Sequence, residues 1–232
     1  MNQEAIEGYD GLLRGHSAFL GMLARLYYRP LSQDELDAIA AMEVADFAFD
    51  DARVGEGLAE AIAYLRRGGS TLRQDVNVDY TSAFYGINSY EGATANPCES
   101  VFLGEDGLIM QAETRAVFNV YKSECIRKDP KLGVPDDHLS FELQFLAMMG
   151  ERAAAALEEG DVPEALRNAG VQQAFLQEHI LAWFPKLKAV ALHLVKTPFY
   201  PGVLTATEGY LTCLLADLRE MQTSPELLER AA

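Results

Sequence analysis

Cysteine is scarce in this 232-residue sequence, which contains only Cys98, Cys125 and Cys213. The three lie far apart and form no Cys-x-x-Cys pair, a pattern typical of free thiols in a reducing compartment rather than of disulfides. Residues 1–8 carry two acids but no basic region followed by an apolar run, so we expect no secretory signal. Apolar runs such as 189–192 are far too short to span a membrane. These absences predict a cytoplasmic protein.

Basic residues are also few, because 19 Lys and Arg stand against 35 Asp and Glu, a net charge of −16. A chain this acidic is repelled by nucleic acid and by anionic membrane surfaces, so neither is an expected partner. The charge favours basic partners, including peptides that carry arginine. It also serves solubility alone, so the charge by itself does not identify a partner.

Motifs for phosphate binding, nucleophilic catalysis and metal binding are missing as well. The sequence has no Gly-x-x-x-x-Gly-Lys-Ser/Thr loop and no Gly-x-Ser-x-Gly elbow. Di-iron helical bundles carry Glu-x-x-His on two helices, but none of the four histidines (16, 138, 179 and 193) follows a Glu by three residues. We therefore expect neither a bound metal nor a cofactor.

Helical periodicity is what the sequence has in abundance. Apolar side chains recur at helical spacing between residues 5 and 28, which predicts a long first helix. Ser32 and Glu35 then form a capping box, a pattern that begins a helix. Residues 139–149 carry one charge, Glu142, among apolar side chains that cover most of the helical circumference. Such a helix is expected to be buried nearly all round.

The chain shows no alternation of strand and helix patterns and no internal repeat. Residues 99–103 have the composition of a short strand, but no partner strand is evident. We therefore expect an all-α fold, a compact helical bundle of roughly nine to eleven helices. We expect a single domain, 1–232, with an N-terminal lobe of about 1–128 and a C-terminal lobe of about 138–232, joined by the 129–138 loop.

The segment Gly133–His138, called the 133–138 corner below, is the densest group of polar signals. Pro135 ends the preceding structure, and Asp136 or Asp137 is expected to cap the next helix. His138 precedes Glu142 by four residues, so both side chains lie on one helical face. One interpretation is structural, with a capping Asp and a His138–Glu142 hydrogen bond. The alternative is an enzyme in which Asp137 and His138 form an acid–base pair.

Four segments resemble the TorD/DmsD family of cytoplasmic chaperones for molybdoenzymes. They occur in the family's order between residues 79 and 183 of the chain. Each pattern is weak alone, but four in the right order within a helical chain are fairly specific. The four segments are Asp79-Tyr80-Thr81-Ser82-Ala83-Phe84, Pro97-Cys98-Glu99-Ser100-Val101-Phe102, Pro135-Asp136-Asp137-His138-Leu139 with the helix after it, and Phe175-Leu176 followed by His179 and Trp183.

The resemblance implies an all-helical protein without catalytic activity. Members of the family bind the twin-arginine signal peptide of a molybdopterin-containing reductase subunit and delay export until the cofactor is inserted, in the service of anaerobic respiration. The implied partners are the leader and the body of such a catalytic subunit, and the implied state is a monomer or a dimer. The implied peptide-binding residues are Tyr80, Phe84, Pro135, Asp137 and His138, and the implied supporting residues are Glu142, His179 and Trp183.

Two departures from the family pattern bear on the peptide preference. Ala83 stands where the family has a leucine before the second aromatic residue, which widens a pocket there. Val134 stands where a glutamate is often found before the corner, which removes one charge from the loop. The resemblance does not identify the client reductase.

Overall fold

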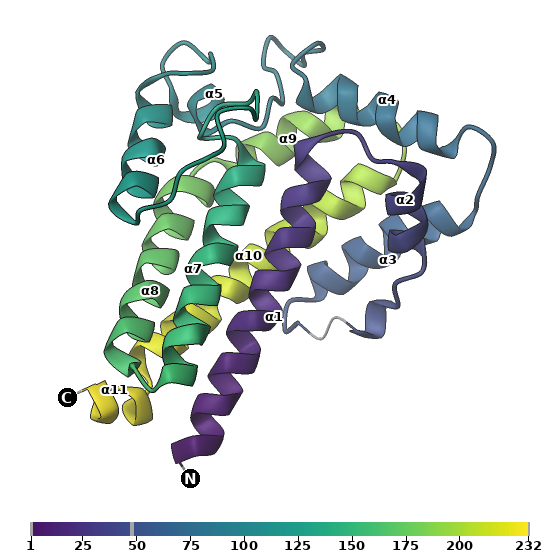
Figure 1. Ribbon diagram of the computed structural model, residues 1–232. Coiled ribbons are helices and arrows are strands. Elements are labelled where there is room, and N and C mark those ends of the chain that lie inside the picture. Colours follow the sequence, from purple (N-terminus) through teal and green to yellow (C-terminus); the bar gives the residue numbers. More distant parts are fainter. Residues whose placement is uncertain (1, 47–48, 232) are drawn as a thin grey trace.

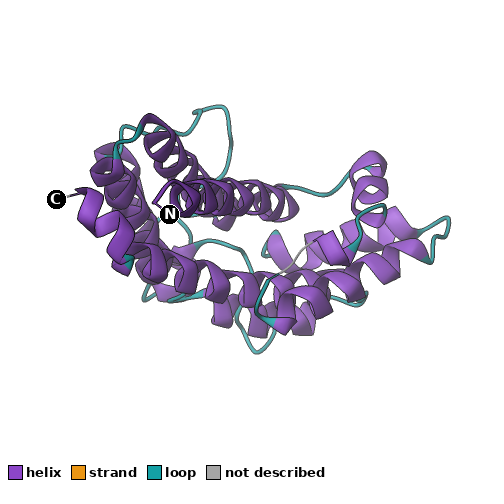
Figure 2. Cartoon of the chain, turned by 90° about the horizontal axis from the view of Figure 1, so that it is seen from below, coloured by secondary structure: helices purple, strands orange, loops and turns teal. Residues whose placement is uncertain are grey.

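Helices form all the regular structure in the computed structural model, which describes residues 2–46 and 49–231 (Figure 1). A 3-10 turn, η1 (Val44–Asp46), precedes α3, and a π-helical turn, η2 (Leu176–Ile180), joins α8 to α9. Figure 2 likewise draws helices and loops and no strand in the described part. The predicted all-α class is confirmed. The α-helices are α1 (Asn2–Tyr28), α2 (Gln33–Ala40), α3 (Ala52–Arg66), α4 (Leu72–Phe84), α5 (Glu99–Leu103), α6 (Ala112–Ser123), α7 (Leu139–Glu159), α8 (Val162–Phe175), α9 (Phe184–Leu194), α10 (Phe199–Thr223) and α11 (Pro225–Ala231).

Local sequence signals explain where several helices begin and end. The hydroxyl of Ser32 accepts from the Glu35 backbone N–H, and the Glu35 carboxylate accepts from the Ser32 N–H at 2.7 Å, so the predicted capping box is confirmed. Asp161 caps α8 through its side chain, which accepts from the Glu164 N–H. Gly160 ends α7 at φ 80°, a left-handed conformation that glycine adopts without a steric cost.

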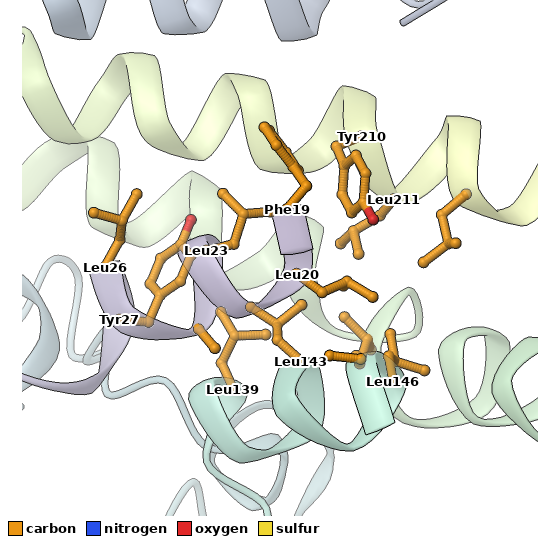
Figure 3. Packing of buried hydrophobic residues seen from close by; sticks show 14 of the residues in the cluster. Phe19, Leu20, Leu23, Leu26, Tyr27, Leu139, Leu143, Leu146, Tyr210 and Leu211 are labelled. Atoms are coloured by element: carbon orange, nitrogen blue, oxygen red, sulfur yellow. The ribbon is translucent and has the colours of Figure 1, made fainter. Parts of the chain in front are cut away.

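The core lies along α1, which packs between α7 and α10 (Figure 3). The rings of Phe19 on α1 and Tyr210 on α10 lie 4.5 Å apart between centroids. Burying each such apolar side chain stabilises the fold by about 1.5–3 kcal/mol. The buried side chains that meet here are Leu20, Leu23, Leu26 and Tyr27 of α1, Leu139, Leu143 and Leu146 of α7, and Tyr210 and Leu211 of α10.

Helices α3 and α10 cross at two glycines, Gly57 and Gly202. A Cβ atom added to Gly202 would lie 2.5 Å from the Gly57 carbonyl oxygen, and one added to Gly57 would lie 2.4 Å from the Gly202 carbonyl oxygen. The two backbones therefore touch directly. The absence of side chains at these two positions is what allows α3 and α10 to approach so closely.

Residues 99–103, which have the composition of a short strand but no evident partner strand, form the short helix α5. The β-branched and aromatic composition of the segment is overridden by contacts from residues distant in the chain. The division into two lobes stays a prediction, although the most extensive helix contacts, α1 with α7 and α3 with α10, cross its boundary.

Among the described helices, none combines the length and the apolar character needed to cross a membrane.

The glycine crossing gives a test of the fold. We expect Gly202→Ala to lower the free energy of unfolding by about 1–3 kcal/mol, because the new methyl group overlaps the Gly57 carbonyl and forces the helices apart. Gly15→Ala in α1 is the matched control, since nothing lies within 4 Å of its added Cβ, and alanine favours a helix by about 0.5–1 kcal/mol. Urea unfolding measures both. A Gly202→Ala variant as stable as the parent contradicts the close crossing.

Candidate functional site

Three of the four family-like segments meet at one end of the molecule, opposite the end that carries both termini (Figure 1). Here α7 begins, α8 ends and α5 lies across them. The backbone N–H of Leu139 donates to the Pro97 carbonyl at 2.8 Å, which fastens the start of α7 to the segment before α5. The site is therefore assembled from segments far apart in the sequence.

Asp137 begins α5 rather than the helix that follows it. Its Oδ2 accepts from the Ser100 backbone N–H at 2.9 Å, and its backbone carbonyl accepts from the Glu99 N–H at 3.0 Å. Asp137 is fully buried, and the start of a helix is where a carboxylate is electrostatically favoured. The prediction of an aspartate cap on the following helix is thus wrong, because the side chain caps a different helix.

His138 is the residue that caps α7. Its Nδ1 accepts from the Ser140 hydroxyl at 2.8 Å and from the Ser140 backbone N–H at 3.3 Å. Burial, with a contribution from the charge of Lys128, lowers the pKa of His138 to about 4. The imidazole is therefore neutral near pH 7 and carries its proton on Nε2.

Two expectations about His138 are corrected by this geometry. The expected His138–Glu142 hydrogen bond is replaced by the bonds to Ser140. The alternative of an Asp137–His138 acid–base pair fails as well, because Asp137 is bonded to the α5 amide and a base of pKa about 4 is weak at neutral pH. The 133–138 corner therefore caps two helices, α5 through Asp137 and α7 through His138.

His179 and Trp183 join α5 to the end of α8. The Nδ1 of His179 donates to the Glu99 carboxylate at 2.9 Å, and the indole N–H of Trp183 donates to the His179 carbonyl. The Trp183 ring stacks on Phe102 with centroids 5.5 Å apart. Both residues sit in or beside η2, where the Leu181 N–H donates to the carbonyl five residues earlier. Such π turns often occur at functional sites.

Glu142 lies at the centre of this arrangement and is completely buried. Among the described residues, no backbone or side-chain N–H reaches either of its oxygens with ordinary hydrogen-bond geometry. Burial raises the pKa of Glu142 well above its usual range, and the charges of Glu99 and Asp137 raise it further. Glu142 therefore keeps its proton to a higher pH than an exposed glutamate does. We call Glu99, Asp137, Glu142, His179 and Trp183 the polar cluster.

Burial also controls the other reactive groups nearby. It raises the pKa of the Cys98 thiol, with a further contribution from the Asp137 charge, so this thiol is a poor nucleophile. Within the described part of the chain, no group of three or more His, Cys, Asp and Glu residues is arranged to hold a metal ion. The polar cluster is thus a network that holds segments together.

Tyr80 and Phe84 lie outside the polar cluster, on the face of α4 that is buried in the core. The Tyr80 hydroxyl donates to the Tyr27 carbonyl at 2.9 Å, and the Phe84 ring packs on Tyr200 with centroids 5.2 Å apart. Pro135 is half-buried in the corner. All five residues expected to bind a peptide are thus wholly or partly covered, and their peptide-binding role stays a prediction.

Exposed residues next to the expected ones were missed by the sequence patterns. Val78, Tyr85 and Ile87 are large apolar side chains that project from α4 and the loop after it. Beside them lies a pocket of about 680 Å³, whose walls include Val78, Ile87, Leu194 and Lys196. The apolar stripe of α4 contains its buried residues, and Val78 lies off that stripe. This spacing is the signal in the sequence that could have identified Val78 as exposed.

Asp136 is the acid of the corner that reaches the surface, with 28% of its side chain exposed. Lys128 lies 3.6 Å from it and also donates to the Val134 carbonyl. The same ammonium group lies 5.1 Å from the centre of the Phe141 ring. A carboxylate and an aromatic face thus hold the ammonium group of Lys128, whose side chain is 15% exposed.

The raised pKa of Glu142 gives a pH test. In the unfolded chain this carboxyl titrates near 4.5, whereas in the folded protein it keeps its proton to higher pH. The stability linked to that proton is complete below about 4.5 and is lost as the pH rises towards the folded-state pKa. Glu142→Gln has a similar shape and does not titrate. Its unfolding free energy relative to the parent is therefore expected to rise with pH, by up to about 1.4 kcal/mol per unit.

Urea unfolding between pH of about 4.5 and 8 measures this difference. Glu159→Gln, at the exposed end of the same helix, is the matched control. A Glu142→Gln difference that stays flat over this range contradicts a protonated Glu142.

Comparison with known proteins shows which family the chain resembles. Residues 49–189 match the model of the family described as nitrate reductase delta subunit. The chaperone protein TorD of Vibrio vulnificus (strain YJ016) is 27% identical over 205 residues, which cover 83% of this chain and 88% of that protein. TorD of Vibrio atlanticus (strain LGP32) is 26% identical over 187 residues, covering 78% and 84%, and TorD of Photobacterium profundum is 28% identical over 131 residues, covering 55% and 59%. The chain therefore belongs to this family, that of the TorD-type molybdoenzyme maturation chaperones, and is a chaperone rather than an enzyme.

Proposed function

We propose that this protein binds the twin-arginine leader of a molybdopterin-dependent reductase precursor in the cytoplasm and delays export until the cofactor has been inserted. The observation that carries the proposal is the surface of the 133–138 corner, where an acid and an aromatic ring hold a cation. Membership of the chaperone family supports it. The net charge of −16 supports it too, because it speeds the approach of a basic peptide in a salt-sensitive way.

In this proposal, the arginine pair of the leader binds at Asp136. The Lys128 ammonium group contacts both the Asp136 carboxylate and the face of the Phe141 ring, which are two kinds of partner that a guanidinium binds well. An arriving arginine replaces Lys128 there and gains from its planar shape, since it bonds a carboxylate with two parallel N–H groups. A charge-assisted hydrogen bond of this kind is worth about 1.5–3 kcal/mol.

The apolar segment of the leader lies along α4. Buried Tyr80 and Phe84 set the shape of this face from below, while Val78, Tyr85 and Ile87 offer the contact surface. The neighbouring pocket of about 680 Å³ is large enough for one or two apolar side chains. Amphipathic helices bind in this manner, with one apolar face laid into a groove.

The α4 face and the corner are mechanically linked through the end of α1. Tyr80 bonds the Tyr27 carbonyl, and the neighbouring Tyr28 ring packs on Phe141 with centroids 5.9 Å apart. Asp137, His138 and the rest of the polar cluster then hold the corner in place. In this proposal, Pro135, Asp137 and His138 act by fixing the shape of the corner, and Glu142, His179 and Trp183 support them.

The first test is calorimetric titration with a synthetic peptide that has an Arg-Arg pair followed by an apolar segment. We expect micromolar or tighter binding, and about ten-fold weaker binding of the Lys-Lys version, because lysine cannot form the two parallel bonds. Tyr85→Ser with Ile87→Ser is expected to weaken both peptides, since it removes apolar contact area. Equal binding of the Arg-Arg and Lys-Lys peptides would contradict the proposed arginine site.

The second test separates contact from support at the corner. Asp136→Asn is expected to remove the preference for Arg-Arg over Lys-Lys while the unfolding free energy stays within about 0.5 kcal/mol of the parent, as for other surface changes. Asp137→Asn is expected to destabilise the fold by about 1–3 kcal/mol, because it weakens the buried cap of α5. Lys128→Ala is expected to bind the Arg-Arg peptide at least as tightly as the parent. Peptide selectivity that survives Asp136→Asn contradicts the assignment.

A further inference from the structure

The loop between α5 and α6 displays three consecutive large apolar side chains. Leu108, Ile109 and Met110 are 60%, 46% and 72% exposed. Single exposed apolar residues are common on protein surfaces, but a contiguous group on a loop marks an interaction site. We call residues 105–110 the apolar loop. It lies outside the polar cluster and the α4 face described above.

The apolar loop is anchored at both ends. Gly104 ends α5 so tightly that an added Cβ would lie 2.8 Å from the Gln111 side-chain oxygen, on the far side of the loop. The Thr114 hydroxyl lies 3.5 Å from the Ser100 hydroxyl, which joins the start of α6 to α5. The loop is therefore carried on α5, which the polar cluster holds through Glu99 and the Ser100 amide.

The backbone turns outward where the apolar side chains are. Gly107 has φ 63°, and Met110 has the same value. For a residue with a side chain this left-handed conformation is unfavourable and persists only where the surroundings impose it. The loop thus presents its apolar side chains to solvent instead of folding them against α6.

The rim of the apolar loop is acidic. Glu105 and Asp106, both exposed, precede the apolar residues and are separated from them by Gly107. We propose that the apolar loop is a docking surface for a protein partner that presents an apolar helical face bordered by lysine and arginine. The apolar face covers Leu108, Ile109 and Met110, and the basic border meets Glu105 and Asp106.

The negative charge of Glu105 and Asp106 favours this partner over two other occupants. A second copy of the chain would bring the same acidic rim against itself in a symmetric dimer, which places like charges together. An anionic membrane would also repel the rim. A partner with basic residues around an apolar face forms apolar contacts with Leu108, Ile109 and Met110 and is also attracted by the acidic rim.

The test uses two synthetic amphipathic helical peptides of equal length and with the same leucine face, one bordered by lysine and one by glutamate. Fluorescence anisotropy measures their binding to the full chain. We expect the lysine-bordered peptide to bind more tightly, and to weaken as salt is added. The variant with Leu108→Ser, Ile109→Ser and Met110→Ser is expected to bind it about ten-fold less tightly. Glu105→Lys with Asp106→Lys is expected to reverse the preference between the peptides.

Ile87→Ser is the matched control, because Ile87 is an equally exposed apolar residue on the α4 face. It is expected to leave binding of the lysine-bordered peptide unchanged, and the triple variant is expected to leave binding of the Arg-Arg leader unchanged. Circular dichroism checks that each variant is folded. Binding that survives the triple variant, or that Ile87→Ser removes, overturns the proposal. So does a dimer, or attachment to phosphatidylglycerol vesicles, that the triple variant abolishes.

Discussion

The hydrogen bond from the Ser100 backbone N–H to the Asp137 carboxylate is the interaction on which the functional end of the molecule depends. It joins residues 37 positions apart in the chain. The Asp137 backbone carbonyl adds a second bond, to the Glu99 N–H, so one residue provides the start of a whole helix. Because α5 has only five residues, it has little helical stability of its own. The buried Asp137 carboxylate fixes the position of α5. That position in turn sets where Glu99 meets His179 and where the apolar loop begins.

The polar cluster then explains why so many charged groups are buried at one place. Taking carboxylates out of water is costly, and a network repays this only when its members are paired. Glu99 has His179, the Asp137 carboxylate has the Ser100 backbone N–H, and the raised pKa of Glu142 lowers the cost by favouring its neutral form. A displacement of α5 relative to α7 or η2 would break the Asp137–Ser100 or the Glu99–His179 contact and leave a buried carboxylate without that partner. Specificity of shape, more than stability, is what such a network provides.

The sequence predicted the parts of this fold that depend on near neighbours. The capping box at Ser32, the long first helix and the buried α7 all follow from patterns within a few residues. Prediction failed where distant segments decide. The side chain of Asp137 caps a helix from another part of the chain, at residues 99–103, and no pattern near Asp137 in the sequence indicated that contact. Family-like patterns identified the members of the polar cluster, but burial could not be read from them, and Tyr80 and Asp137, two of the residues expected to bind a peptide, are buried.

This division between buried pattern and exposed surface bears on how such a chaperone selects its client. The residues that resemble the family are those that fix the corner and the α4 face from inside. The residues available for contact are their exposed neighbours, Asp136 on the corner and Val78, Tyr85 and Ile87 on α4 and its loop. In the proposed mode of binding, a change at an exposed position alters recognition and leaves the fold intact, since surface substitutions usually change stability by less than about 0.5 kcal/mol. A change in the polar cluster alters the fold first. Client preference is therefore expected to depend on the exposed set, and Ala83, which lies in the buried set, to act through the shape of α4 beneath it.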